Sequence, residues 1–240
     1  QTCKDREIIV VDNGSTDGSL EIIKEKFAGR IRLIENKDNL GFAGGNNVGI
    51  SSARGSYIAL LNNDAVPDVN WLGELVGAAR KSASDFGMWA SKILFYDDRK
   101  IIDTAGHLIY RDGLNRGRGK GELDRGQYDR EEEVFFPSGC AALYSKSMLD
   151  RIGLFDADFF AYGDDTDVGL KARIAGWKCL YVPAAIVYHR SSATTGRYSP
   201  LKAYLVERNR FWILIKYFPV RYILLSPLYT ITRLVLQAYG

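Results

Sequence analysis

The chain has 240 residues, of which 46% are hydrophobic and 25% are charged, and its formal net charge is +3 at pH 7. This balance fits one folded domain with a terminal appendage and excludes a largely disordered chain. The net charge is too small to indicate a nucleic acid partner.

The cysteines and the apolar runs indicate where the protein works. Three cysteines (Cys3, Cys140 and Cys179) lack metal-ligand spacing, which indicates a reducing compartment and argues against a disulfide framework. No signal peptide is visible, and no uncharged apolar run approaches the roughly 20 residues that a membrane span needs. We therefore expect a cytoplasmic protein.

Strands and helices alternate through the first third of the chain. Apolar runs predict buried strands at 7–11, 31–34 and 57–61. One helix is predicted to follow the turn at 12–17, with Ser15 or Thr16 as its cap. A second, short helix is predicted to follow the Gly/Asn loop at 39–47 and to end at Ala53, and a third is predicted near 70–82. This order predicts an α/β fold with a mainly parallel, doubly wound sheet and helices on both faces.

The rest of the chain is less regular. Strands are predicted at 88–95, 101–110, 135–144, 179–182 and 186–189, a mobile loop at 111–133, and a helix at 164–175 with Leu170 and Ile174 facing inward. From residue 201 onward, aliphatic and aromatic residues mix with six basic residues and one acidic residue, and Pro219 and Pro227 are expected to break the segment. Residues 201–240 either pack as a terminal helix on a domain formed by 1–200 or lie on an anionic membrane surface.

Polar side chains follow several predicted strands. Asp12 ends the first strand, Asn62-Asn63-Asp64 ends the third, and His189 ends the last. Open α/β sheets bind ligands at the carboxyl ends of their strands, and hard oxygen ligands there suit a divalent cation that carries phosphates. Asp64 and His189 could share one metal site, although a turn and a packed histidine are the alternatives.

Two other segments carry candidate chemistry. The glycine-rich loop at 41–49 could hold phosphates at a helix start, but Ile50 stands where a P-loop needs lysine. The carboxylates of Asp164, Asp165 and Asp167 either cap a helix or supply a base for an acceptor hydroxyl.

Six segments resemble, in order, the motifs of family 2 glycosyltransferases with a GT-A fold, and most closely their rhamnosyltransferase-like branch. They are EIIVVDNGSTDGS (7–19), NLGFAGGNNVG (39–49), LLNND (60–64), PSGCAAL (137–143), FAYGDDTD (160–167) and VYH (187–189).

The resemblance implies an inverting enzyme that uses a nucleotide-diphosphate sugar donor and a divalent cation, Mn2+ or Mg2+. Asp165 matches the base of inverting members, and Asp164 replaces the glutamate before it. Asp64 matches the last residue of an Asp-x-Asp motif, Asn62 replaces the first, and His189 matches a position that contacts metal or diphosphate. The nucleotide-sugar site is expected to contain Asp12, Asn13, Gly14, Asn39, Gly41, Asn47, Asn63 and Asp64, with Arg208 and Arg210 reaching the diphosphate.

The expected acceptor is a cell-surface polysaccharide or a lipid-linked saccharide, with residues 201–240 at the cytoplasmic face of a membrane. The family's first strand is expected to precede Gln1. Two alternatives stay open at this point. One is a non-catalytic sugar-nucleotide or glycan-binding module, because fold does not establish function. The other is a nucleotidyltransferase, which needs a basic, glycine-rich loop near its first strand.

Overall fold

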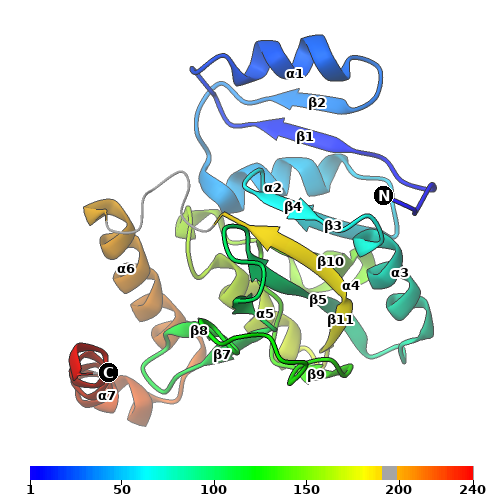
Figure 1. Ribbon diagram of the computed structural model, residues 1–240. Helices are drawn as coiled ribbons and strands as arrows, with labels where there is room; N and C mark the ends of the chain where they lie inside the picture. The colour runs from blue at the N-terminus through cyan, green and yellow to red at the C-terminus, as the bar shows by residue number, and fades with distance from the viewer. Residues whose placement is uncertain (191–198, 240) are drawn as a thin grey trace.

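The structure is a computed structural model that describes residues 1–190 and 199–239 (Figure 1). Its N-terminal part contains β1 (Ile9–Asp12), α1 (Ser19–Phe27), β2 (Arg32–Glu35) and α2 (Gly41–Ser52). Strands β1 and β2 form a parallel two-stranded sheet, and α2 packs against β1. The predicted side-chain cap of α1 is wrong, because Gly18 occupies the N-cap and the amide of Ser15 instead donates to the Asp12 carboxylate.

A seven-stranded sheet forms the centre of the molecule. Its main path runs β3 (Tyr57–Leu61), β10 (Ala141–Ser145), β5 (Phe86–Phe95), β11 (Lys178–His189) and β4 (Ala65–Pro67), with β6 (Ile102–Thr104) on β5 and β9 (Glu132–Val134) on β11. Strands β3, β5 and β11 run in one direction, and β10 and β4 run against them.

Helices cover both faces of this sheet. On one face α3 (Trp71–Lys81) packs Leu75 against Trp89. On the other face α4 (Lys146–Ile152) and α5 (Asp164–Ile174) pack Leu149 and Val168 near Met88. Met88 and Trp89 are neighbours on β5 and face opposite clusters, since successive strand residues point to opposite sides. The predicted α/β fold with helices on both faces is confirmed.

Several predicted strand boundaries are corrected. The strand expected at 101–110 is two strands, β6 and β7 (His107–Ile109), because Gly106 turns the chain between them with φ +94°. The strand expected at 135–144 begins only at Ala141. The two short strands expected at 179–189 are one strand, β11, whose register shifts between Val182 and Ile186, where Pro183 cannot donate a ladder hydrogen bond.

The segment 111–133 is folded rather than an open loop. Strand β8 (Asn115–Gly117) pairs with β7. The buried ammonium of Lys92 on β5 lies 2.9 Å from Asp124 and 2.5 Å from Asp129. Two of the charges in the segment predicted as a mobile loop therefore pair with the central sheet.

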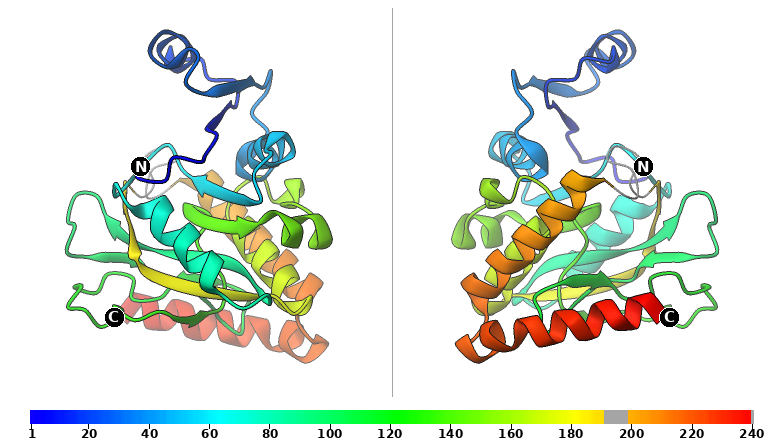
Figure 2. Two further views of the ribbon diagram at one scale, coloured as in Figure 1. Left: turned by 90° about the vertical axis from the view of Figure 1, so that its right-hand side faces the viewer. Right: turned by 90° about the vertical axis from the view of Figure 1, so that its left-hand side faces the viewer.

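The C-terminal segment forms α6 (Pro200–Tyr217) and α7 (Val220–Tyr239); α7 lies at the end of the molecule away from the β1–β2 sheet, and α6 runs along one side toward it (Figure 2). Pro219 separates them as predicted, but Pro227 lies inside α7. A proline removes the donor for the carbonyl four residues earlier, and here the Ser226 hydroxyl donates to that carbonyl, of Ile223, at 2.8 Å.

Helix α6 packs on α5, where Ile213 joins Phe159 and Leu170 in one apolar cluster. Leu170 is buried as predicted, but Ile174 at the end of α5 is 71% exposed. Within the two described ranges, no helix combines the length and the apolar character that crossing a membrane requires.

Candidate active site

Asp64 and His189 come together because β4 pairs antiparallel with the end of β11. In this register His189 lies opposite Ala65, so Asp64, the residue just before β4, lies beside the imidazole. The Asp64 Oδ1 and His189 Nε2 atoms are 3.4 Å apart, and Asp64 Oδ1 is buried without a hydrogen-bond partner. Two potential ligands thus face one point at the sheet edge.

Asp103 on β6 orients this histidine, and the sequence analysis missed it. Its Oδ2 lies 2.7 Å from His189 Nδ1, and its Oδ1 accepts a hydrogen bond from Lys120 at 2.8 Å. Burial by itself lowers the pKa of His189, but the Asp103 hydrogen bond and the Asp64 carboxylate outweigh it and raise the pKa to about 12. The only signal in the sequence was a carboxylate directly after Ile101 and Ile102.

The pair could hold a hard divalent cation if the cation displaces the second proton of His189, because only a neutral imidazole ligates a metal, and the nucleotide-sugar donor would supply further ligands. No group of three or more His, Cys, Asp or Glu side chains in the described ranges could hold a metal ion. Two protein ligands are compatible with Mn2+ or Mg2+ when phosphate oxygens and water complete the shell. A carboxylate that holds the far nitrogen of a metal-binding histidine is a common supporting contact in such sites.

The expected nucleotide-binding residues cluster around the end of β1 and the start of α2. Asp12 Oδ2 accepts hydrogen bonds from the amides of Gly14 and Ser15, both at 3.1 Å, and hydrogen bonding by Ser15 lowers the pKa of Asp12. Asn13 Nδ2 donates to the Gly41 carbonyl at 2.8 Å, while Asn39 Oδ1 accepts from the Gly41 amide at 2.9 Å.

Gly41 also connects this cluster to the segment before α5. It has φ +70°, and an added Cβ would lie 2.4 Å from the carbonyl oxygen of Phe160, so only glycine fits. Asn47 has a different task, because both ends of its amide bond to the backbone of Phe155, at 2.7 and 3.0 Å. Asn63 is exposed beside Asp64.

Asp164 and Asp165 open α5 in different surroundings. Asp164 is 4% exposed, and burial, followed by the nearby Asp165 charge, raises the pKa of its carboxyl well above the ordinary value. Asp165 Oδ2 accepts from the Gly139 amide at 3.2 Å, and Oδ1 accepts from Asn115 Nδ2 at 3.4 Å. The raised pKa favours the protonated form of Asp164, and a protonated carboxyl cannot accept a proton from a hydroxyl.

Asn209 on α6 holds the segment that leads into α5. Phe160 and Tyr162 have φ of 62° and 68°, a strained conformation for residues other than glycine. The Asn209 amide donates to the carbonyls of Phe159, Ala161 and Tyr162 at 2.6–2.9 Å. Sequence reasoning missed this residue, because nothing in α6 itself points to a segment about 50 positions earlier.

Arg208 and Arg210 also take part in packing α6. Arg208 donates to the carbonyls of Asp158 and Phe159, both at 2.9 Å. Arg210 is 4% exposed and donates to Glu207 at 2.8 Å and to the Asp112 carbonyl at 2.9 Å. These contacts give no support to the prediction that the two guanidinium groups reach the diphosphate.

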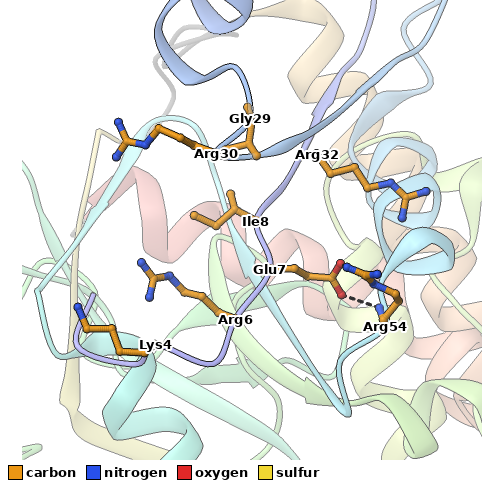
Figure 3. Close-up of a pocket in the computed structure, with 9 residues that line it drawn as sticks. Lys4, Arg6, Glu7, Ile8, Gly29, Arg30, Arg32 and Arg54 are labelled. Carbon is orange, nitrogen blue, oxygen red and sulfur yellow. Dashed lines mark hydrogen bonds and ion pairs between the residues drawn. The ribbon is translucent and has the colours of Figure 1, made fainter.

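A cavity of about 490 Å³ lies away from these residues, between the segment that leads into β1, the start of β2 and Arg54 after α2 (Figure 3). Its lining residues are Lys4, Arg6, Glu7, Ile8, Gly29, Arg30, Ile31, Arg32 and Arg54. Glu7 pairs with Arg54 at 3.4 Å, and none of the lining residues belongs to the predicted site. The candidate site is therefore the cluster of side chains at the sheet edge and not this cavity.

Comparison with known proteins agrees with the motifs. Residues 1–153 match the family model described as glycosyl transferase family 2. The chain belongs to this family. Residues 120–239 also match the model of glycosyl transferase family group 2.

Relatives support the predicted branch of family 2. An uncharacterized protein of Sinorhizobium fredii is 28% identical over 208 residues, which cover 79% of this chain and 22% of that protein. An N-acetylglucosaminyl-diphospho-decaprenol L-rhamnosyltransferase of Mycobacterium tuberculosis is 26% identical over 210 residues, covering 79% of this chain and 68% of that protein. The chain therefore spans less than a quarter of the first relative and about two thirds of the second.

Solved structures confirm the GT-A fold that the motifs predicted. GalNAc-T7, solved with UDP, GalNAc and Mn2+, has a TM-score of 0.61 at 19% identity, covering 76% of this chain and 37% of that one. A mannosyltransferase of Pyrobaculum calidifontis, solved with GDP-Man and Mn2+, has a TM-score of 0.55 at 16% identity, covering 87% of this chain and 65% of that one. At these identities the likeness concerns the fold alone.

Proposed function

We propose that this family 2 domain transfers a sugar from a nucleotide-diphosphate donor to an acceptor hydroxyl with inversion at the anomeric carbon. The observation that carries the proposal is the Asp64–His189 pair, 3.4 Å apart at the sheet edge, with Asp103 fixing the imidazole. The Mn2+ bound in two structural neighbours supports a divalent cation at this pair.

The chemistry assigned to the protein is one proton transfer and one displacement. Asp165 takes the proton of the acceptor hydroxyl, and the acceptor oxygen attacks the anomeric carbon opposite the diphosphate. The bond between that carbon and the phosphate oxygen breaks, and its electron pair leaves with the nucleoside diphosphate. A cation held by Asp64 and His189 would stabilise the charge that develops on this leaving group.

The proposed acceptor is a polysaccharide or a lipid-linked saccharide, with α7 lying on the cytoplasmic face of a membrane. Five apolar residues at helical spacing are 49–75% exposed on α7: Val220, Leu224, Leu228, Ile231 and Val235. A helix with an exposed apolar face can lie in a membrane interface. The M. tuberculosis relative, whose name contains a decaprenol-linked sugar, supports a lipid-linked acceptor.

The basic residues of this region contribute less to the proposal than their number suggests. Lys216 pairs with Asp156 and Asp167, and Arg233 pairs with Asp112 and Glu207. Their charges are thus directed toward the protein. The exposed apolar face, and not the positive charge, is the main support for membrane contact.

The donor is identified first, by thermal shift with a panel of dTDP-rhamnose, UDP-N-acetylglucosamine, UDP-galactose and GDP-mannose in the presence of Mn2+. With that donor, substitution of Asp165 by asparagine tests whether Asp165 is the base. We expect Asp165→Asn to lower kcat by about 10²–10⁴-fold, because a positioned base contributes that much, while the donor Kd stays unchanged. Equal loss of donor binding would contradict the assignment, and binding without any release of nucleoside diphosphate in the parent protein would favour a non-catalytic module.

Removal of divalent cations tests the Asp64–His189 pair. We expect EDTA to weaken binding of the nucleoside diphosphate and to stop transfer, and excess Mn2+ to restore both. Asp64→Asn should reduce the effect of Mn2+ on diphosphate binding measured by calorimetry, since it removes a charged ligand. Full transfer in EDTA would remove the cation from the proposal.

A further inference from the structure

The imidazole of His107 lies beside the carboxylate proposed as the base. Strand β7 carries His107 and its partner strand β8 carries Asn115, so one hairpin brings both side chains to Asp165. His107 Nδ1 is 3.5 Å from Asp165 Oδ2 and is buried without a hydrogen-bond partner. Catalytic hydrogen bonds are often long before substrate binds and shorten in the reacting complex.

The surroundings of His107 keep its ring in place. Its backbone amide donates to the Phe136 carbonyl at 3.0 Å, and the imidazole meets the Phe136 ring edge to face at 5.4 Å. Burial lowers the pKa of His107, and the charges of Asp165 and Asp103 offset only part of this effect. The ring is therefore neutral at pH 7, and since a carboxylate only accepts hydrogen bonds, the tautomer that suits Asp165 has its proton on Nδ1.

We propose that His107 is a positioning residue for Asp165: its Nδ1–H, together with Asn115 and the Gly139 amide, turns the carboxylate toward the acceptor hydroxyl. A neutral donor holds the carboxylate without adding the full positive charge that would weaken it as a base. The inference rests on the role of Asp165 proposed above. It adds the β7–β8 hairpin to the proposed active site, although the sequence predicted only a strand at 101–110 and a loop at 111–133 in this region.

Nitrogen NMR of the histidine side chains tests the contact without any ligand. The chain has two histidines, so the signals of a ¹⁵N-histidine sample can be assigned with one His189→Asn variant. At pH 7 we expect a neutral His107 ring with its proton on Nδ1, and loss of that preference in Asp165→Ala. A proton on Nε2 in the parent protein, or a signal that Asp165→Ala leaves unchanged, would overturn the proposal.

Kinetics with the tightest-binding sugar nucleotide of the panel test the consequence. His107→Leu should lower kcat by about 10- to 100-fold, because a small displacement of a base has that effect, while the donor KM changes less than about twofold. His107→Asn, whose amide nitrogen replaces Nδ1, should recover most of kcat, and His107→Gln should not. Equal kcat in the Leu and Asn variants would reject the positioning role.

Asp165→Asn, measured alongside, separates the two proposals. If it stops transfer while His107→Leu does not, His107 has no such role and the base assignment stands. If Asp165→Asn retains transfer, both proposals fail. Melting curves of each variant show whether a loss reflects unfolding.

Discussion

Asp164 and Asp165 are neighbours in the chain, yet their carboxyl groups have different surroundings. Asp164 is buried at the start of α5, whereas Asp165 accepts hydrogen bonds from β8 and from the turn before β10, and His107 Nδ1 on β7 lies 3.5 Å away. Environments that separate the pKa values of two nearby carboxyls are a common way to give them different roles. Here burial favours the protonated form of Asp164, and the proposed proton transfer is assigned to Asp165.

We expect Asp164→Asn to stabilise the protein at pH 7. Burial raises the pKa of Asp164, so the folded state keeps a proton that the unfolded chain releases above about pH 3.9. The contribution of Asp164 to the free energy of unfolding is therefore fully present below that pH and is lost as the pH rises through the folded-state pKa. Asparagine does not ionise, so Asp164→Asn avoids this loss of unfolding free energy, and Tm should rise by roughly 2–4 °C for each kcal/mol of unfolding free energy gained.

Thermal unfolding between pH 4 and pH 8 measures this effect. The advantage of Asp164→Asn should shrink as the pH falls toward 4, and the exposed Asp158→Asn serves as the matched control with no expected change. Lower stability of Asp164→Asn at every pH would mean that the ionised carboxylate is hydrogen-bonded favourably in the folded protein.

At the scale of elements, α6 functions as a support for the start of α5. Its Asn209 holds three carbonyls of the strained segment 159–162, and its Lys216 and Tyr217 contact the buried Asp167 at 2.6 and 2.5 Å. Strain at functional sites persists only where surrounding contacts enforce it. The helix predicted as a terminal appendage thus helps to position the proposed base.

Asn209→Ala tests this support. We expect it to lower the free energy of unfolding by about 1–3 kcal/mol, because the part-buried carbonyls of Ala161 and Tyr162 lose this donor while that of Phe159 keeps Arg208, and to lower kcat as well. Urea unfolding and turnover of the donor measure the two effects. Thr232→Ala is the matched control, since this exposed hydroxyl bonds only within α7. A destabilised Asn209→Ala variant with unchanged kcat would show that α6 does not control the geometry of Asp165.

At the scale of the whole molecule, the apolar face of α7 is the surface that most needs an explanation. Leu224 is 75% exposed and Val220 is 68% exposed, although monomeric proteins rarely expose a contiguous apolar row of this kind. Of the two arginines on α7, Arg233 is engaged in ion pairs and Arg221 is exposed, so the proposed membrane contact depends mainly on apolar burial. Such contact should depend only weakly on salt, since screening weakens only the electrostatic part.

Vesicle co-sedimentation tests this expectation. The chain should bind vesicles of phosphatidylcholine and phosphatidylglycerol at low and high salt, and the combined variant Leu224→Ser, Leu228→Ser and Ile231→Ser should lose most of this binding. Ile22→Ser on α1, at a site 51% exposed, is the control that should bind like the parent chain. Equal binding by the triple variant would reject α7 as the contact surface.

The sequence by itself determined which polar side chains stand at the ends of several strands and at the start of one helix. They are the carboxylates of Asp12 at the end of β1 and of Asp64 after β3, His189 at the end of β11, and the acids at the start of α5. These features depend on local patterns, namely apolar runs, turns and helix starts, so one segment suffices to predict them. Only the tertiary structure decided which residues surround these groups. Asp103 beside His189, Asn209 beside the segment before α5, and the pairing of Lys92 with the 111–133 segment join parts of the chain that are 32 to 86 residues apart. Strand register and packing bring such residues together, and neither can be derived from the residues near each group alone.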